Sequence, residues 1–179
     1  MQKEYTFLPS LNDESKLQIV FIHGLLGSQG DFLEYIKYYR KTASIILISL
    51  PGHDRNYIKN LDLDINVWIL DVINKSLDPF KDTIFVTHSL SSSLLSDQNI
   101  FKYKNIKYVF HIAPIVFSNF FLNKNINLSL NQRLEIMIQN QLVIPKRIDS
   151  HEKINKGNFL KFYDQYSNYL FSENYKFSY

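Results

Sequence analysis

The chain has 179 residues, which is enough for one domain with a sizeable hydrophobic core. Its net charge is only +3, and the surplus lies in residues 120–179, so the charge is too weak for a nucleic-acid-binding surface. The absence of cysteine excludes disulfides, thiolate zinc sites and a cysteine nucleophile. The first sixteen residues lack the apolar core of a signal peptide, and no apolar run is long enough to span a bilayer. We therefore expect a cytoplasmic protein.

Four short apolar runs predict strands. They are Leu17–Ile22, Ser44–Leu50, Asp82–His88 and Ile106–Ile112. The apolar residues in these runs are nearly continuous rather than alternating, which is typical of parallel strands that are covered on both faces.

Helical patterns lie between the predicted strands. The expected apolar stripes are Phe32, Ile36 and Tyr39; Leu63, Val67, Leu70, Ile73 and Leu77; and Leu90, Leu94 and Leu95. Strands that alternate with helices indicate βαβ units. We predict an α/β fold, with an open and mostly parallel sheet and helices on both of its faces.

The alternation of strand-like apolar runs with helical patterns ends after Pro114. Two further helical stripes follow, the first made by Leu130, Leu134, Ile138 and Leu142, and the second by Phe159, Phe162, Tyr166, Tyr169 and Leu170. We therefore divide the chain into an α/β core over residues 1–116 and a helical segment over residues 117–179, which we expect to pack on the core as one domain.

The residues suited to chemistry lie at the carboxyl ends of the predicted strands, where open α/β sheets place their sites. The first strand leads into His23-Gly24, the second into Pro51-Gly52-His53, and the third into His88-Ser89. Ser89 lies directly between a strand and a helix, and a serine on such a sharp turn exposes its hydroxyl.

Three segments together resemble the α/β-hydrolase family. FIHGLLGSQGDF is similar to the oxyanion loop of that family, LPGHD to the loop after its next strand, and VTHSLSS to its nucleophile elbow. They occur in the family's order and at its spacing, across residues 17 to about 116. The residues HGLLGS and LPGHD in the first two segments favour the branch that holds small esterases, lipases and carbon–carbon bond hydrolases. The resemblance also implies that the helical residues after 116 correspond to the family's lid.

The resemblance implies a role for several residues. Ser89 would attack the carbonyl carbon of a small or lipid-like ester, and the backbone N–H groups of Leu25 and Leu90 would form the oxyanion hole. His23, with Gly24, would support the oxyanion loop rather than transfer protons. His88 would be structural.

The sequence departs from the family's G-x-S-x-G elbow at both glycines. Thr87 and Ser91 occupy those positions. The glycines let the strand and the helix approach closely around a strained serine. Serine is a small replacement, but the β-branched Thr87 is expected to crowd the helix unless the turn opens.

The acid and the histidine of the triad form a second departure. In the family both follow two further strands, and no such strands are visible here, so we expect the chain to end within or just after the lid-like segment. His111 lies inside an apolar run, which predicts a core histidine. His151 lies in a polar link and is the candidate base, with Asp149, or else Glu152, as its orienting acid.

Three readings follow. The chain is a serine hydrolase of small or lipid-like esters, or a non-catalytic remnant or binding protein of the same fold, or an incomplete chain whose missing strands lie on a neighbouring gene product. We predict no cofactor, because no glycine-rich phosphate-binding motif follows a strand. We predict no metal site, because no two histidines lie at ligand spacing. The sequence leaves the oligomeric state open.

Overall fold

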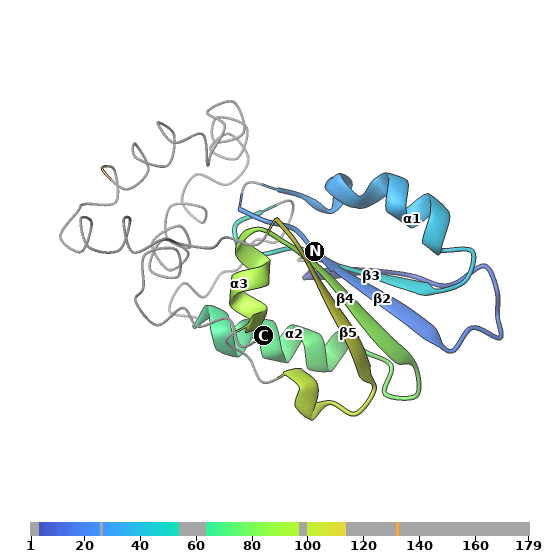
Figure 1. Cartoon of the computed structure of the whole chain (residues 1–179). Coiled ribbons are helices and arrows are strands. Elements are labelled where there is room, and N and C mark those ends of the chain that lie inside the picture. Colours follow the sequence, from blue (N-terminus) through green and yellow to red (C-terminus); the bar gives the residue numbers. More distant parts are fainter. Residues whose placement is uncertain (1–3, 26, 54–63, 97–99, 114–131, 133–179) are drawn as a thin grey trace.

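The computed structural model describes residues 4–25, 27–53, 64–96, 100–113 and 132. In these residues the strands form one five-stranded sheet in the order β1-β3-β2-β4-β5 (Figure 1). The strands are β1 (Tyr5–Leu8), β2 (Leu17–Ile22), β3 (Ser44–Ile48), β4 (Asp82–His88) and β5 (Ile106–Ile112). The helices are η1 (Gln29–Phe32), α1 (Leu33–Tyr39), α2 (Ile65–Ser76), α3 (Leu90–Ser96) and η2 (Ile100–Lys102).

The four predicted strands pair in parallel, as expected. Strand β2 lies at the centre, between β3 and β4, and β4 also pairs with β5. Sequence analysis missed β1, which pairs antiparallel with β3 and brings Tyr5 opposite Ile48. The four residues of β1 carry too little apolar pattern to predict a strand, and they depend on a partner some forty residues further along the chain.

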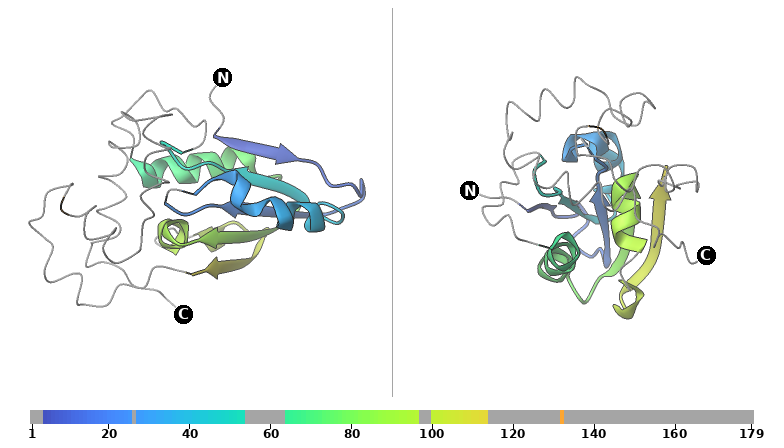
Figure 2. Two further views of the ribbon diagram at one scale, coloured as in Figure 1. Left: turned by 90° about the horizontal axis from the view of Figure 1, so that it is seen from above. Right: turned by 90° about the vertical axis from the view of Figure 1, so that its left-hand side faces the viewer.

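Helices cover both faces of the sheet. Helix α1 lies on one face, and α2 and α3 lie on the other (Figures 1 and 2). The α1 side buries Phe21, Phe32 and Ile36. The opposite side buries a larger cluster, built from β2, β3 and β4 together with α2 and α3. This arrangement confirms the predicted fold class for the described residues.

Helix α2 presents a different face to the sheet from the one expected. Its buried residues are Ile65, Trp68, Ile69, Val72 and Ile73. Val67 was placed in the predicted stripe but is 62% exposed. The helix starts directly after Asp64, whose carboxylate caps Asn66 N–H at 2.7 Å. Several apolar residues flank the true stripe, so sequence spacing alone could not choose between adjacent faces.

The predicted coverage of strand β5 on both faces is wrong for the described residues. The strand was predicted to be covered on both faces, but it is the edge strand of the described sheet, and Tyr108, Phe110 and Ile112 are 61%, 55% and 39% exposed. The apolar run was read correctly as a strand, but its coverage depends on elements elsewhere in the chain. Within the described ranges, no helix is long and apolar enough to cross a membrane.

Candidate functional site

The parallel pairing brings three loops to one edge of the sheet. Because β2, β3 and β4 run in the same direction, their carboxyl ends are adjacent. His23 and Gly24 follow β2, residues 50–53 follow β3, and Ser89 follows β4. The residues singled out from the sequence on these three loops therefore lie at one edge of the sheet.

Ser89 forms a one-residue turn between a strand and a helix. Strand β4 ends at His88 and α3 begins at Leu90. The φ angle of Ser89 is 54°, in the left-handed region that non-glycine residues rarely adopt. Its backbone N–H donates to the Ile112 carbonyl at 3.0 Å, and its carbonyl accepts from Ser92 N–H at 3.1 Å. These bonds to β5 and α3 hold the strained turn in place, and such strain is typical of functional sites.

Gly24 brings the loop after β2 into direct contact with this turn. A Cβ atom on Gly24 would lie 2.9 Å from Ser89 Cβ and 3.0 Å from both Nδ1 and the carbonyl oxygen of His88. Only a residue without a side chain lets the two segments approach so closely. The contact also shows that the His88 imidazole lies beside the Gly24 loop.

A tight turn shapes the rest of this loop. Gly27 N–H donates to the Gly24 carbonyl at 3.0 Å. A Cβ atom on Gly27 would lie 2.7 Å from Asp31 Oδ2, and that carboxylate accepts a hydrogen bond from Ser28 N–H at 3.0 Å. The turn therefore depends on the absence of a side chain at Gly27 and on the Asp31 carboxylate that follows it.

His23 is held by backbone groups at both ring nitrogens. Leu50 N–H donates to Nε2 at 3.2 Å, so Nε2 carries the lone pair, and Nδ1–H donates to the Gly24 carbonyl at 2.8 Å. The ring is fully buried, and it lies 5.0 Å from the ring of the equally buried His53. This neutral imidazole ties the loop after β2 to the loop after β3, a geometry suited to supporting the loop rather than to proton transfer.

Thr87 and Ser91, which stand where the family's elbow has glycine, both form side-chain hydrogen bonds. Ser91 Oγ donates to the Ile22 carbonyl at 2.8 Å and accepts from His88 N–H at 2.9 Å. Thr87 is fully buried, and its hydroxyl contacts Ser92 Oγ at 3.1 Å. The strand and the helix therefore pack without glycine, because each hydroxyl contacts polar groups of neighbouring elements.

His111 is not the core histidine that its apolar run predicted. The residue lies on β5 as expected but is exposed, because β5 is an edge strand in the described structure. Its Nδ1 contacts Thr87 Oγ1 at 2.7 Å. Partial desolvation of the ring lowers the pKa of His111, which favours the neutral imidazole. Its ring is therefore engaged with Thr87, two residues before Ser89.

The two backbone groups expected to form an oxyanion hole each follow one partner of the close contact between Gly24 and Ser89. Leu25 follows Gly24, and Leu90 is the first residue of α3, where N–H groups have no acceptor within the helix. His151, Asp149 and Glu152 lie outside the described residues. Sequence reasoning missed the hydrogen bonds of Thr87 and Ser91, although it singled out both positions as departures from the family's pattern.

No protein-family model and no curated protein matches the sequence. Solved structures do match. MenH from S. aureus is 18% identical with a TM-score of 0.62, and the match covers 95% of this chain and 71% of MenH. A probable hydrolytic enzyme from Pseudomonas aeruginosa PAO1 is 12% identical with a TM-score of 0.63, and the match covers 94% of this chain and 62% of that enzyme.

A structure reported for carboxylesterases of the thaumarchaeon Nitrososphaera gargenis is 16% identical with a TM-score of 0.60, and the match covers 93% of this chain and 67% of that one. This chain thus spans about two thirds of the length of these proteins. At such low identities the likeness shows the fold alone, and it agrees with the mostly parallel sheet described above. The chain has the α/β-hydrolase fold.

Proposed function

We propose that this protein is a serine hydrolase that cleaves a small or lipid-like carboxylic ester with Ser89 as its nucleophile. The observation that carries the proposal is the strained turn at Ser89, with φ of 54°, against which Gly24 packs without a side chain. A strained serine between a strand and a helix is the geometry of a nucleophile elbow, in which the serine hydroxyl is presented at the end of the sheet.

The proposed chemistry has two steps. Ser89 Oγ attacks the ester carbonyl carbon, its proton passes to a base, and the negative charge on the carbonyl oxygen is stabilised by the N–H groups of Leu25 and Leu90. The C–O bond to the alcohol then breaks, with the base returning the proton to the leaving alcohol. Water activated by the same base hydrolyses the acyl-serine and regenerates the hydroxyl.

The base is proposed to be His151, oriented by Asp149 or Glu152. Both ring nitrogens of His23 already bond to backbone groups, so His23 is a poor base. His111 Nδ1 is engaged by Thr87. A productive base needs a ring nitrogen roughly 2.6–3.2 Å from Ser89 Oγ once substrate is bound.

The names of similar structures support the substrate class. They include a monoacylglycerol lipase of Paleococcus ferrophilus and the carboxylesterases of Nitrososphaera gargenis. Both names describe ester cleavage. Short acyl p-nitrophenyl esters are the natural first substrates for this chain, because they require little from the pocket.

Fluorophosphonate labelling tests the nucleophile. We expect a covalent adduct on the parent protein, mapped to Ser89 by peptide mass spectrometry, and no adduct on Ser89→Ala. Ser93→Ala is the matched control, because Ser93 lies one helical turn further on and its buried hydroxyl has no hydrogen-bond partner among the described residues. An unlabelled parent protein with a normal folded spectrum would exclude an active elbow and favour the non-catalytic reading.

Comparing His151→Ala with His111→Ala tests the base. We expect His151→Ala to lower ester turnover by about two orders of magnitude or more, and His111→Ala to have a much smaller effect. Both variants must first give the parent's far-UV circular dichroism. If His151→Ala turns over as fast as the parent, His151 is not the base, and the remaining activity comes from binding and the oxyanion hole.

A further inference from the structure

The hydroxyl of Thr87 lies between the two elements that hold the serine turn. Thr87 stands two residues before Ser89 on β4, and its side chain is fully buried. Its Oγ1 lies 3.1 Å from Ser92 Oγ on α3 and 2.7 Å from His111 Nδ1 on β5. A hydroxyl has one proton and two lone pairs, so it can donate to Ser92 while it accepts from the Nδ1–H of His111. One side chain of β4 therefore contacts both neighbouring elements.

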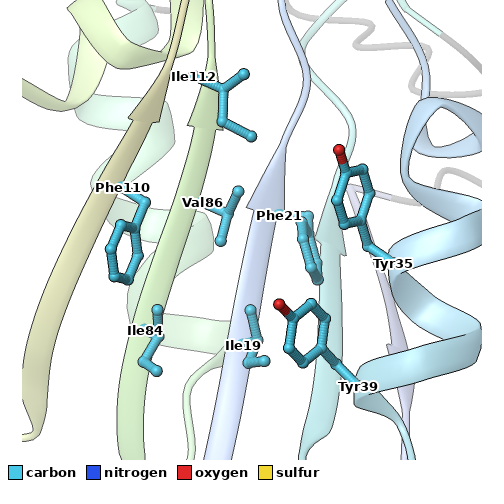
Figure 3. Close-up of a pocket in the computed structure, with 8 residues that line it drawn as sticks. All are labelled: Ile19, Phe21, Tyr35, Tyr39, Ile84, Val86, Phe110 and Ile112. Atoms are coloured by element: carbon cyan, nitrogen blue, oxygen red, sulfur yellow. The ribbon is translucent and has the colours of Figure 1, made fainter.

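The register of the sheet brings Thr87 and His111 together. Val86 on β4 and Phe110 and Ile112 on β5 point toward the α1 side of the sheet (Figure 3). Successive residues of a strand point to opposite faces, so Thr87 and His111 point toward the face that carries α3. The two residues are also direct partners in the parallel pairing of β4 with β5. Their contact is therefore built into the strand pairing.

The two contacts of the Thr87 hydroxyl lead to the backbone groups that fix Ser89. The N–H of Ser89 donates to the carbonyl of Ile112, the residue directly after His111, at 3.0 Å. The carbonyl of Ser89 accepts from the N–H of Ser92 at 3.1 Å. The hydroxyl thus links β5 and α3 at the points where each element holds Ser89. Loss of this link would let β5 and α3 shift relative to each other, and the φ of 54° at Ser89 would lose part of its support.

We propose that Thr87 and His111 are a positioning pair for the nucleophile, in which the Thr87 hydroxyl joins β5 to α3 and so holds Ser89 in its left-handed turn. This inference rests on the proposed function of Ser89. The family's elbow has glycine at the position of Thr87, where no side chain can form these bonds. Neither residue of the pair exchanges a proton with the substrate, so both act on the reaction only through the position of Ser89.

Removing the hydroxyl tests the pair in the full chain. Thr87→Val keeps the branched shape of the side chain and deletes the hydroxyl, whereas Thr87→Ser keeps the hydroxyl. We expect the rate constant of fluorophosphonate labelling at saturating probe to fall by roughly tenfold in Thr87→Val, because a displaced nucleophile loses its alignment. The probe concentration that gives half of the maximal rate should stay within about twofold of the parent's, because binding of the probe is unchanged. Thr87→Ser should restore the parent's rate constant.

Substitution of His111 tests the other half of the pair. His111→Leu removes the ring nitrogen, and His111→Asn places an amide group near the position of Nδ1. We expect His111→Leu to slow labelling by roughly three- to tenfold and His111→Asn to restore most of the rate. The double variant of Thr87→Val and His111→Leu should label about as fast as the slower single variant, because both changes break one contact. Since His111 is exposed, its variants carry the test if Thr87→Val fails to fold.

Thr83→Val is the matched control for Thr87→Val. Thr83 is also a fully buried threonine of β4, but it lies at the other end of the strand. There its hydroxyl accepts from the side-chain amides of Gln18 and Asn105, at 2.8 and 3.1 Å. Thr83→Val should lower the urea midpoint and leave the labelling rate unchanged. A loss of stability alone would therefore appear in both variants, and slower labelling only in Thr87→Val.

Hydrogen exchange at the Ser89 amide separates this inference from the proposed function. That N–H, which bonds to the Ile112 carbonyl, should exchange roughly tenfold faster in Thr87→Val than in the parent and in Thr83→Val. NMR measures this rate whether or not the serine reacts. A parent protein that is not labelled would refute the nucleophile, and the exchange rate would still show whether the pair holds the turn.

Four results would overturn the positioning pair. The first is labelling of the folded Thr87→Val and His111→Leu variants at the parent's rate. The second is equal slowing by Thr83→Val and Thr87→Val, which would assign the effect to stability. In the third, the two effects multiply in the double variant, so that the residues act independently. The fourth is an unchanged exchange rate of the Ser89 amide in Thr87→Val.

Discussion

The contact between Gly24 and Ser89 makes a sharp prediction for the variant Gly24→Ala. The added Cβ would lie 2.9 Å from Ser89 Cβ, whereas ordinary van der Waals contact begins near 3.4 Å, so the two segments must separate by about half an ångström. The nearest atoms belong to the backbone and first side-chain carbon of the strained turn and to the His88 ring. None is the far end of a flexible side chain, so the strain cannot be relieved by a simple rotation.

Gly24→Ala should lower both the free energy of unfolding and the rate of Ser89 labelling. Overpacking a tight contact costs about 1–3 kcal/mol of unfolding free energy, which urea denaturation followed by circular dichroism can measure. Displacing the loop that carries Leu25 N–H should slow fluorophosphonate labelling of Ser89 by roughly 10- to 100-fold, since an error of 1 Å can cost about 100-fold. Labelling is measured as a pseudo-first-order rate below the urea transition.

Gly30→Ala is the matched control for this prediction. Gly30 lies in η1, directly after the same loop, and is exposed, and a Cβ there would meet only Ser28 Oγ, at 3.2 Å. Neither glycine has a left-handed φ, so the two substitutions differ in steric contact and not in backbone strain. If Gly24→Ala keeps both the parent's labelling rate and its urea midpoint, the close approach of the loop to the serine turn is wrong.

Three further predictions concern two buried polar side chains and one partly desolvated histidine. Ser93→Ala should leave the unfolding free energy unchanged or raise it by up to about 1 kcal/mol in urea denaturation, because the buried Ser93 hydroxyl has no partner among the described residues; a loss above this would mean that a bond exists. Gln18→Leu should cost about 2–3 kcal/mol by the same assay, because the Gln18 amide pairs with both backbone groups of Asp78, at 2.8 and 3.1 Å; a neutral result would show that water replaces it. Partial desolvation of the ring lowers the pKa of His111. The unfolded chain therefore binds a proton first as the pH falls below about 6.5, and stability should fall with decreasing pH until the lower folded pKa is passed. The variant His111→Gln should lack this part of the pH dependence of the urea midpoint, and an unchanged dependence would assign it to other groups.

The described sheet could be predicted largely from local sequence pattern. Runs such as Leu17–Ile22 and Asp82–His88 are short, apolar and separated by helical spacing, and a parallel α/β sheet is the arrangement that buries them. The position of Ser89 was equally local, because a strand that passes directly into a helix leaves one residue for the turn. These features depend on neighbours within a few residues, so a single sequence contains them.

Other features depend on contacts between distant segments and became visible only in the tertiary structure. Strand β1 exists through its pairing with β3, and the buried face of α2 is set by the sheet beneath it. Thr87 fits in place of a glycine because His111 and Ser92, from two other elements, meet its hydroxyl. From its own residues β5 looked like a buried strand. Its exposure follows from its place at the edge of the described sheet, and an apolar run cannot indicate whether a neighbour lies beside it.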